Sequence, residues 1–173
     1  MKGAILVLTL LFLTACTTQE TIEQTPNEVF NMNLKSNDFN QGDMIQSKFT
    51  CQGENINPHL AWDDVPTDTK SFALIVDDPD APSGNWVHWL VKDIPSDIRE
   101  IQQNSIPGKQ VNNDFGKGDY GGPCPPSGTH RYFFKLFALD VETLDAETAE
   151  DLYQQAEQHA IAKAELMGTY EKT

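Results

Sequence analysis

The sequence is short of basic residues and of cysteine, and both shortages exclude classes of protein. Its 173 residues include 12 Lys and Arg against 26 Asp and Glu, which gives a formal net charge of −14. Electrostatic binding of nucleic acid needs a basic face that displaces the counterions of the phosphates, and so few scattered basic residues do not form one. The same balance argues against a basic patch that adheres to anionic lipid. Three cysteines are too few for a small domain built on a disulfide framework.

Internal repeats and low-complexity blocks are also absent from the sequence. Hydrophobic residues make up 39% of the chain and include nine Phe and three Trp. This content is enough to build a core, so the sequence is not that of a disordered protein. The length predicts one domain.

The first residues have the pattern of a bacterial signal peptide. Lys2 is a short positive region, and residues 4–13 form an apolar stretch that is too short to span a bilayer but suits a signal peptide. The stretch ends in LTAC at residues 13–16, which resembles the lipobox, where the signal is cut before a cysteine that carries lipid. An ordinary secretory signal with an incidental Cys16 is the alternative.

The lipobox interpretation divides the chain into three regions. Residues 1–15 are the lipoprotein signal peptide, residues 16–27 are the lipidated Cys16 and a flexible polar tether, and residues 28–173 are the folded domain. Acyl chains on Cys16 predict a protein anchored to a membrane outside the cytoplasm. Because residue 17 is Thr rather than Asp, we expect the periplasmic side of the outer membrane if the host has two membranes.

Short apolar segments separated by Gly, Pro and Asn predict a mainly β fold. Many short strands separated by such turn residues favour an antiparallel β-sandwich. Segments that are apolar on both faces, such as residues 86–94, predict that other elements cover the sheet. The expected strands are residues 29–34, 44–50, 60–62, 71–77, 86–94 and 130–139.

One segment near the C-terminus has helical periodicity. Thr148 and Asp151 have the spacing of a capping box at its start, and Gly168 suits its end. We therefore expect a C-terminal α-helix that covers one sheet, followed by a short strand at residues 169–172. The apolar residues that recur at steps of three and four are Ala149, Leu152, Tyr153, Ala156, Ala160, Ala164 and Met167.

The first candidate motif is DPDAP at residues 78–82, which follows a buried strand. Its prolines fix the backbone and present Asp78 and Asp80 on a stiff turn. The alternative is a structural turn in which each carboxylate caps nearby N–H groups. His88 lies within the next apolar strand, on the same side as Trp86 and Leu90, and is either part of a site or a satisfied core histidine.

The second candidate motif is GDYGGPCPPSGTHRY at residues 118–132. Glycines let backbone N–H groups point into a concavity, which is how loops bind anions without net positive charge. His130 and Tyr132 are two apart at the start of a strand, so they share a face. Arg131 faces the other way and is expected to form a structural ion pair. A rigid structural loop is the alternative for the whole segment.

Together these motifs, DPDxP…HW and GxYGGPxPPxGxHRY, resemble those of the phosphatidylethanolamine-binding protein family, also called Raf-kinase-inhibitor-like. The bacterial branch is also similar in FTCQG at residues 49–53 and in NINPHLAW at residues 55–62, and the resemblance covers about residues 49–170. It implies two antiparallel sheets packed face to face, with a C-terminal helix and short peripheral helices. His59 departs from the branch, which usually has Pro there, and either alters the rim of the pocket or is simply exposed.

The resemblance also implies a small pocket that accepts an anion. The imidazoles, the tyrosine hydroxyl and loop N–H groups would donate hydrogen bonds to an oxyanion, and one of the two aspartates would orient an imidazole. Residue by residue, the ligand site carries over to Asp78, Asp80, Pro82, His88, His130 and Tyr132, with Gly121 and Gly122 close by.

Cys51 and Cys124 are expected to form a disulfide. They are the two thiols that remain once Cys16 is lipidated, the compartment is oxidising, and the family fold brings their loops to one end of the sandwich. The alternative is that each is a small buried hydrophobe.

These expectations describe a binding protein rather than an enzyme, with no catalytic residue, metal or cofactor. The ligand would be a phosphate-bearing small molecule, a lipid headgroup or an acidic peptide group. The family also implies inhibition of a protein target. Both a monomer and a homodimer are compatible with the sequence. The alternative is a metal-assisted hydrolase that uses the Asp and His cluster. Against it, the sequence has neither HExxH nor GxSxG.

Overall fold

The computed structural model describes residues 30–172, so the expected signal peptide, Cys16 and the tether lie outside the described residues. This part of the chain is mainly β with one α-helix, as the sequence predicted. Within it, no helix combines the length and the apolarity that crossing a membrane requires. The elements are β1 (Phe30–Asn31), β2 (Asn33–Lys35), the 3-10 helix η1 (Ser47–Phe49), β3 (Leu60–Asp63), β4 (Ser71–Asp78), β5 (Trp86–Pro95), β6 (Glu100–Ile101), β7 (Lys109–Gln110), β8 (Thr129–Leu139), α1 (Ala149–His159) and β9 (Ala160–Glu171).

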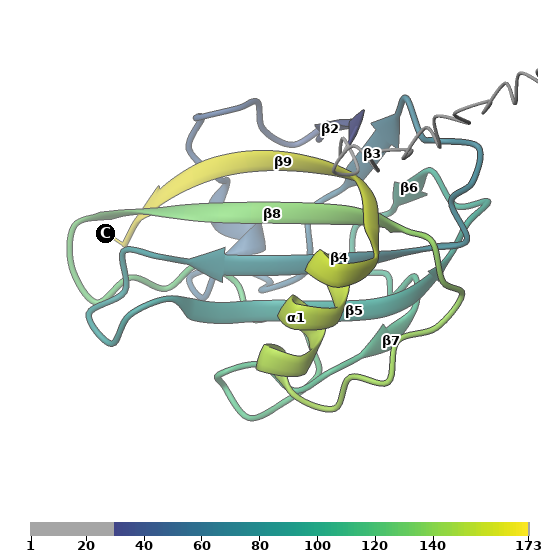
Figure 1. Cartoon of the computed structure of the whole chain (residues 1–173). Helices are drawn as coiled ribbons and strands as arrows, with labels where there is room; N and C mark the ends of the chain where they lie inside the picture. The colour runs from purple at the N-terminus through teal and green to yellow at the C-terminus, as the bar shows by residue number, and fades with distance from the viewer. Residues whose placement is uncertain (1–29, 173) are drawn as a thin grey trace, which may run out of the picture.

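The strands form two sheets (Figure 1). Six strands make the larger sheet, in the order β1-β9-β8-β4-β5-β7, and three make the smaller one, in the order β2-β3-β6. The pairings are antiparallel except that of β1 with β9, which is parallel. The larger sheet is therefore mixed rather than purely antiparallel.

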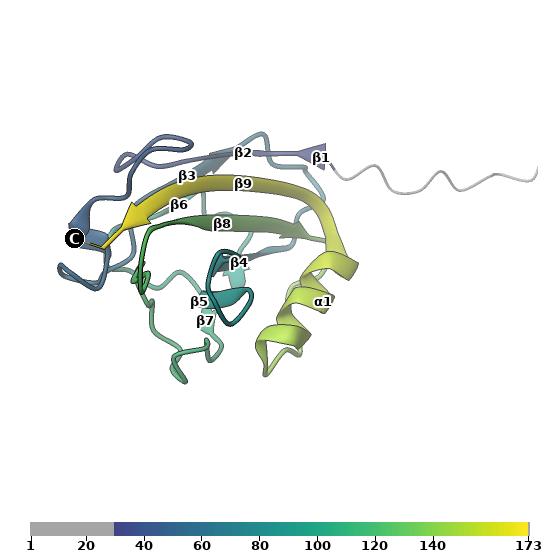
Figure 2. The same ribbon diagram turned by 90° about the vertical axis from the view of Figure 1, so that its left-hand side faces the viewer.

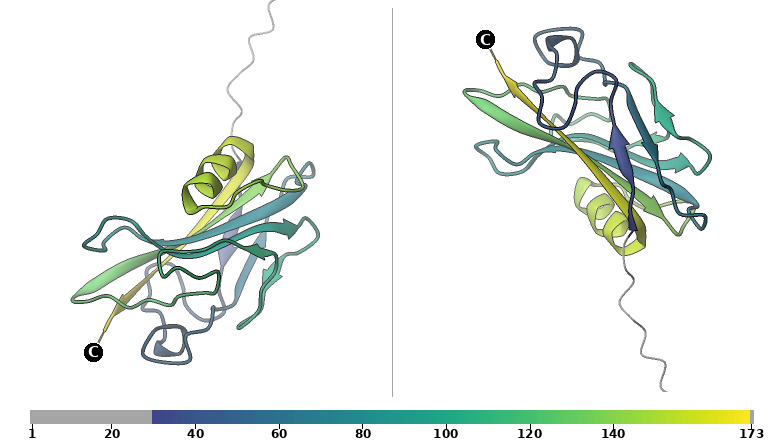
Figure 3. Two further views of the ribbon diagram at one scale, coloured as in Figure 1. Left: turned by 90° about the horizontal axis from the view of Figure 1, so that it is seen from below. Right: turned by 90° about the horizontal axis from the view of Figure 1, so that it is seen from above.

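The larger sheet is buried on both faces, which explains the apolar composition of its central strands. On one face, the ring of Trp62 in β3 packs against Phe72 in β4, with centroids 5.3 Å apart, in a core that both sheets share. On the other face, Leu152 and Ala156 of α1 are fully buried in a second core with Ile75 of β4. Figures 2 and 3 show the smaller sheet and α1 on opposite faces. The expectation that other elements cover the sheet is confirmed.

The C-terminal helix is shorter than the sequence predicted. The capping box at its start is present, because Thr148 and Asp151 each accept the backbone N–H of the other. The helix ends at His159, however, and the residues expected to continue it form β9. Burial along β9 alternates with a period of two, and β8 pairs with it along nearly its whole length. Strand pairing therefore overrides the helical spacing of the alanines.

Gly168 lies inside β9 and is not a helix stop. A Cβ at this position would lie 2.6 Å from the Ile45 side chain, so glycine allows the segment before η1 to pack closely on β9. Residues 44–50 do not form the expected strand, since Met44 makes only an isolated bridge to Thr169 before the 3-10 helix begins. The strand expected at residues 29–34 is divided between β1 in the larger sheet and β2 in the smaller one.

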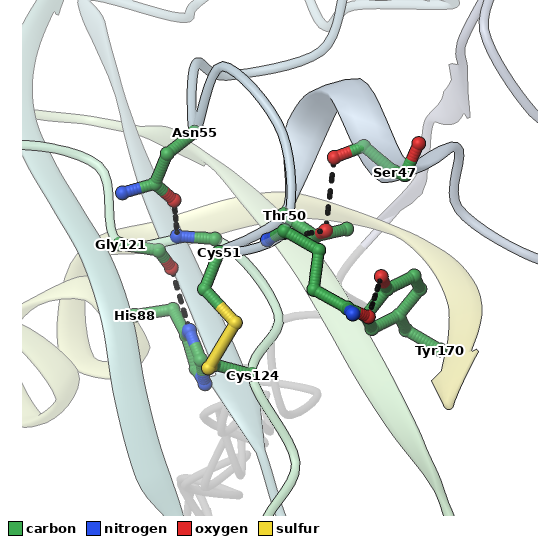
Figure 4. The surroundings of a disulfide bond; sticks show 10 residues. Ser47, Thr50, Cys51, Asn55, His88, Gly121, Cys124 and Tyr170 are labelled. Carbon is green, nitrogen blue, oxygen red and sulfur yellow. Dashed lines mark hydrogen bonds between the residues drawn. A yellow bond between two sulfur atoms is a disulfide. The ribbon is translucent and has the colours of Figure 1, made fainter. Parts of the chain in front are cut away.

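The disulfide between Cys51 and Cys124 is present, which confirms the expected pairing (Figure 4). Its Cα atoms lie 5.4 Å apart, and it joins two loops separated by 73 residues. The backbone N–H of Cys51 also donates to the carbonyl of Pro123 over 3.1 Å. The glycine-rich loop is therefore fastened to the segment that follows η1 by both a covalent bond and a hydrogen bond.

Replacing Cys51 and Cys124 together by Ser is expected to lower the free energy of unfolding by up to about 4 kcal/mol, because the cross-link restricts the unfolded chain. Guanidinium titration of both proteins, without reductant, measures the difference. The native, unreduced protein should show neither thiol in a thiol assay. Two reactive thiols at these positions would contradict the disulfide.

Candidate functional site

Three strand ends bring the expected site residues together at one end of the larger sheet (Figure 1). Because β4 runs antiparallel to both β5 and β8, the end of β4 lies beside their beginnings. Asp78 is the last residue of β4, and His130 and Tyr132 lie near the start of β8. His88 lies near the start of β5. Polar side chains that are distant in sequence therefore meet at a buried edge of the core.

Asp78 and His130 form a buried pair. Nδ1 of His130 lies 2.7 Å from a carboxylate oxygen of Asp78. The side chain of His130 is only 8% exposed and that of Asp78 only 4%. Since a carboxylate accepts and cannot donate, Nδ1 carries the proton and Nε2 is left for another partner. The other Asp78 oxygen accepts the N–H of Asp80 over 2.9 Å, which holds the carboxylate in place.

His88 is oriented by a backbone carbonyl rather than by an aspartate. Its Nδ1 donates to the carbonyl of Gly121 over 2.6 Å. The register between β4 and β5 shifts at this point, so His88 is an extra residue on β5 and forms a β-bulge. The bulge turns the His88 side chain toward Tyr132, and the centroids of the two rings lie 5.2 Å apart. The expectation that His88 shares a side with Leu90 was wrong, because the bulge breaks the alternation and Leu90 packs in the core under α1.

Burial lowers the pKa of His88 below its ordinary value, although the hydrogen bond to Gly121 and the charge of Asp78 oppose the shift. Neutral His88 has its proton on Nδ1, so Nε2 is an acceptor near neutral pH. It becomes a donor only when the imidazole is protonated.

Tyr132 carries the least satisfied polar group of the cluster. The side chain is fully buried, and among the described residues no group meets the distance and angle of a hydrogen bond to its hydroxyl, although the Asp78 carboxylate and the backbone of Cys124 lie close enough to shift its pKa. Burial and then the nearby charge of Asp78 raise the pKa of the hydroxyl, which therefore keeps its proton. A buried donor without a partner costs about 1–3 kcal/mol, so the position is unfavourable unless a ligand or water completes it.

Asp80 bonds to Arg131 and to neither imidazole. The guanidinium makes two hydrogen bonds to its carboxylate, of 2.8 and 2.6 Å, and the Arg131 N–H adds a third. These hydrogen bonds lower the pKa of Asp80 to about 2. The expected ion pair of Arg131 is confirmed, and Asp80 fixes the turn above the site. Pro82 is exposed in the same turn.

Gly121 and Gly122 are close to the cluster, but their N–H groups do not face it. The Gly121 N–H donates to the carbonyl of His88, and the Gly122 N–H donates to the side-chain oxygen of Asn55. Figure 4 shows the side chain of Asn55 beside this loop and the ring of His88 bonded to the carbonyl of Gly121. The idea that these groups receive an anion was wrong, because both are already used inside the protein. A Cβ at Gly121 would lie 2.5 Å from the ring of Phe115, so the glycine provides space.

Phe115 is a residue that the sequence reasoning missed. Its ring lies 5.3 Å from that of His88 and 5.5 Å from that of Trp86, and the side chain is 44% exposed. It therefore forms part of the rim beside the imidazole. The available signal was an aromatic residue standing alone in a polar, glycine-rich stretch.

His59 does not join the cluster. Its Nδ1 accepts the N–H of Asn37, and its Nε2 lies 3.4 Å from a carboxylate oxygen of Glu100. The side chain is buried where β3 meets β6, so it is a structural histidine and not an exposed one. Residues 30–172 contain no group of three His, Cys, Asp or Glu side chains arranged to hold a metal ion.

Comparison with known proteins decides the family. A profile described as phosphatidylethanolamine-binding protein matches residues 35–171. The chain belongs to this family. A UPF0098 protein of Methanothermobacter thermautotrophicus is 48% identical over 151 residues, covering 82% of this chain and 99% of the relative. The UPF0098 protein YbhB of Escherichia coli is 44% identical over 131 residues, covering 67% of this chain and 83% of YbhB.

Solved structures of the family share the fold. The phosphatidylethanolamine-binding protein homolog CT736 of Chlamydia trachomatis matches with a TM-score of 0.78 and 42% identity, over 83% of this chain and 99% of that one. Escherichia coli YbcL matches with a TM-score of 0.77 and 32% identity, over 83% of this chain and 99% of that one. The mainly β architecture with one helix is thus the architecture of the family.

The lowered pKa of His88 predicts a specific pH dependence of stability. Between its folded pKa and about 6.5, the unfolded chain takes up a proton at His88 that the folded protein does not, so acid lowers the free energy of unfolding. The protein should therefore lose stability relative to the His88→Gln variant as the pH falls from 7 to 5. Urea titrations at several pH values measure this difference. A difference that is constant with pH would contradict the assignment.

Proposed function

We propose that this family member binds a small phosphate-type anion at the end of β4, β5 and β8, through His88, His130 and Tyr132. The observation that carries the proposal is the fully buried Tyr132 hydroxyl, a donor without a partner in the described part of the chain. An oxyanion oxygen is the acceptor that such a donor lacks. Asp78 orients His130 in the site, while Asp80 and Pro82 form the turn that borders it.

The two imidazoles define how the anion is received. Nδ1 of each is bonded to the protein, so the Nε2 atoms are left for the ligand. His130, paired with Asp78, donates from Nε2 when it is protonated. His88 is neutral near pH 7 and accepts from Nε2, so it suits the P–O–H of a phosphate monoanion. The site therefore favours an anion that still carries one proton.

Binding without catalysis is favoured because the cluster contains no serine, threonine or cysteine beside a general base, and the metal-assisted hydrolase would need a metal to activate water. The described residues offer no group of ligands for such a metal. A free phosphate monoester can present a P–O–H to His88, whereas the phosphodiester of a phospholipid headgroup has no such proton and would bind through acceptor oxygens alone. A protein partner that this site regulates would bind through an acidic or phosphorylated peptide group.

Tyr132→Phe is expected to leave the free protein as stable as before, or more stable by about 1 kcal/mol, because it deletes an unsatisfied buried hydroxyl. The same change should weaken phosphate binding about tenfold or more, since a hydrogen bond to the anion is lost. Calorimetric titration with inorganic phosphate and O-phosphorylethanolamine, together with urea unfolding, tests both effects.

Tyr120→Phe is the matched control. The Tyr120 hydroxyl is also buried but donates to the carbonyl of Phe49 over 3.1 Å, so its loss should lower stability by about 1 kcal/mol and leave phosphate affinity unchanged. Equal phosphate affinity in the protein and in Tyr132→Phe would show that the pocket is not the anion site.

We also propose that Cys16 is lipidated and that the protein is anchored to a membrane outside the cytoplasm. The LTAC sequence at residues 13–16 after a short apolar stretch supports this, as does a disulfide, which suits an oxidising compartment. Cys16→Ser should release the protein from the membrane fraction or leave it unprocessed, whereas Thr17→Ser should change neither property. Membrane fractionation and intact mass measure the outcome. Membrane-bound Cys16→Ser at the mature mass would refute the anchor.

A further inference from the structure

A hollow of about 160 Å³ lies beside the glycine-rich loop, and four of its ten lining residues are amides. We refer to it as the amide hollow. Asn55, Asn104, Gln110 and Asp119 line it, and the ring of Tyr120 forms part of its wall. No side chain of the candidate anion site lines it, so it is a separate feature of the molecule.

Two of the lining amides have their orientation fixed by the protein. The side-chain oxygen of Asn55 accepts the N–H of Gly122 over 2.8 Å, and that of Gln110 accepts the indole N–H of Trp89 over 2.8 Å. Because the oxygens are engaged, the NH2 groups remain as donors. The NH2 of Gln110 lies 3.4 Å from a carboxylate oxygen of Asp119, which is long for a hydrogen bond and leaves both groups able to bind a ligand hydroxyl.

Two lining residues have a left-handed backbone. The described residues include four non-glycine residues with positive φ, and two of them, Asn55 at 56° and Asn104 at 53°, line the amide hollow. Asparagine adopts this conformation more readily than most residues. The Asn104 amide is exposed and makes no side-chain hydrogen bond to any described residue, so it is available at the rim.

The chemistry of the lining selects the class of ligand. Asp119 is the only charged residue of the hollow, so neither phosphate nor another anion finds a cation there. Amide donors beside a carboxylate acceptor match vicinal hydroxyl groups, each of which both donates and accepts. Ile106 at the rim is 59% exposed and suits the apolar C–H face of a sugar ring. We propose that the amide hollow binds a neutral saccharide.

Trp89 provides a specific reporter for the test. Its indole N–H bonds to Gln110, so a sugar that engages this amide should shift the Trp89 indole resonance in a proton–nitrogen correlation spectrum of the protein. The buried indole N–H of Trp62 has no hydrogen-bond partner among the described residues and should not move. The titrants are glucose, N-acetylglucosamine and galactose up to about 100 mM, because a hollow this small is expected to bind with millimolar affinity. Sodium chloride serves as the ionic control, since phosphate is the ligand proposed for His88, the chain neighbour of Trp89.

Two variants locate the binding. Asp119→Asn removes the carboxylate acceptor and should weaken saccharide binding about tenfold, whereas Asp97→Asn, on an exposed turn away from the hollow, should not alter it. Asn104→Gly keeps the positive φ, deletes the amide and should also weaken binding. Three results would overturn the proposal: no Trp89 shift with any of the three sugars, an equal shift with sodium chloride, or sugar affinity that ignores both Asp119→Asn and Asn104→Gly. None of these results bears on the anion site.

Discussion

The complete burial of β4 is the constraint on which the rest of the structure depends. All eight of its residues are buried, with the smaller sheet over one face and α1 over the other. The strand ends in two aspartates, and alternation places them on opposite faces of the sheet. Asp78 pairs with His130 on one face, while Asp77 accepts from Lys135, Asn85 and Tyr153 on the other. A single strand end thus organises two polar clusters, one inside the core and one beneath the helix.

The two basic side chains of β8, beside the candidate anion site, are both paired with aspartates. Arg131 forms an ion pair with Asp80, and Lys135 forms one with Asp77. Both basic side chains lie on the side of the sheet that faces α1. The donors of the site are then neutral groups and imidazoles, in a chain of formal net charge −14. Binding at such a site depends on the placement of protons more than on attraction between full charges, and the overall negative field keeps affinity modest.

The sequence predicted the parts of the fold that depend on local patterns. The apolar segments that became β3, β4, β5 and β8 were predicted within one or two residues, and so was the helix start, because the capping pair of Thr148 and Asp151 is a local signal. The end of α1 was not predictable, since alanines spaced for a helix are equally compatible with a strand once β8 offers a partner. The division of the first strand between two sheets likewise depends on contacts made far along the chain.

The meeting of Asp78, His88, His130 and Tyr132 could be predicted from the sequence motifs, whereas the detailed geometry could be predicted only in part. The resemblance named the residues that meet, but a bulge at His88 and the engagement of the Gly121 and Gly122 N–H groups arise from register and loop packing. The position of the glycine loop depends on Asn55, which accepts the Gly122 N–H, and on the disulfide to Cys51. Both Asn55 and Cys51 lie more than sixty residues earlier in the chain than the glycines. Neither motif contains that information.

The parallel pairing of β1 with β9 fixes the direction in which the molecule presents its site. Phe30 lies opposite Ala162, which in turn lies opposite Ala138, whereas His130 is at the other end of β8. Eight residues of strand separate the two places, or about 26 Å. The chain enters the domain beside α1, at the end remote from the candidate site, as Figure 2 shows. The first described residues and the candidate site therefore lie at opposite ends of the larger sheet, so contacts made at one end leave the other end accessible.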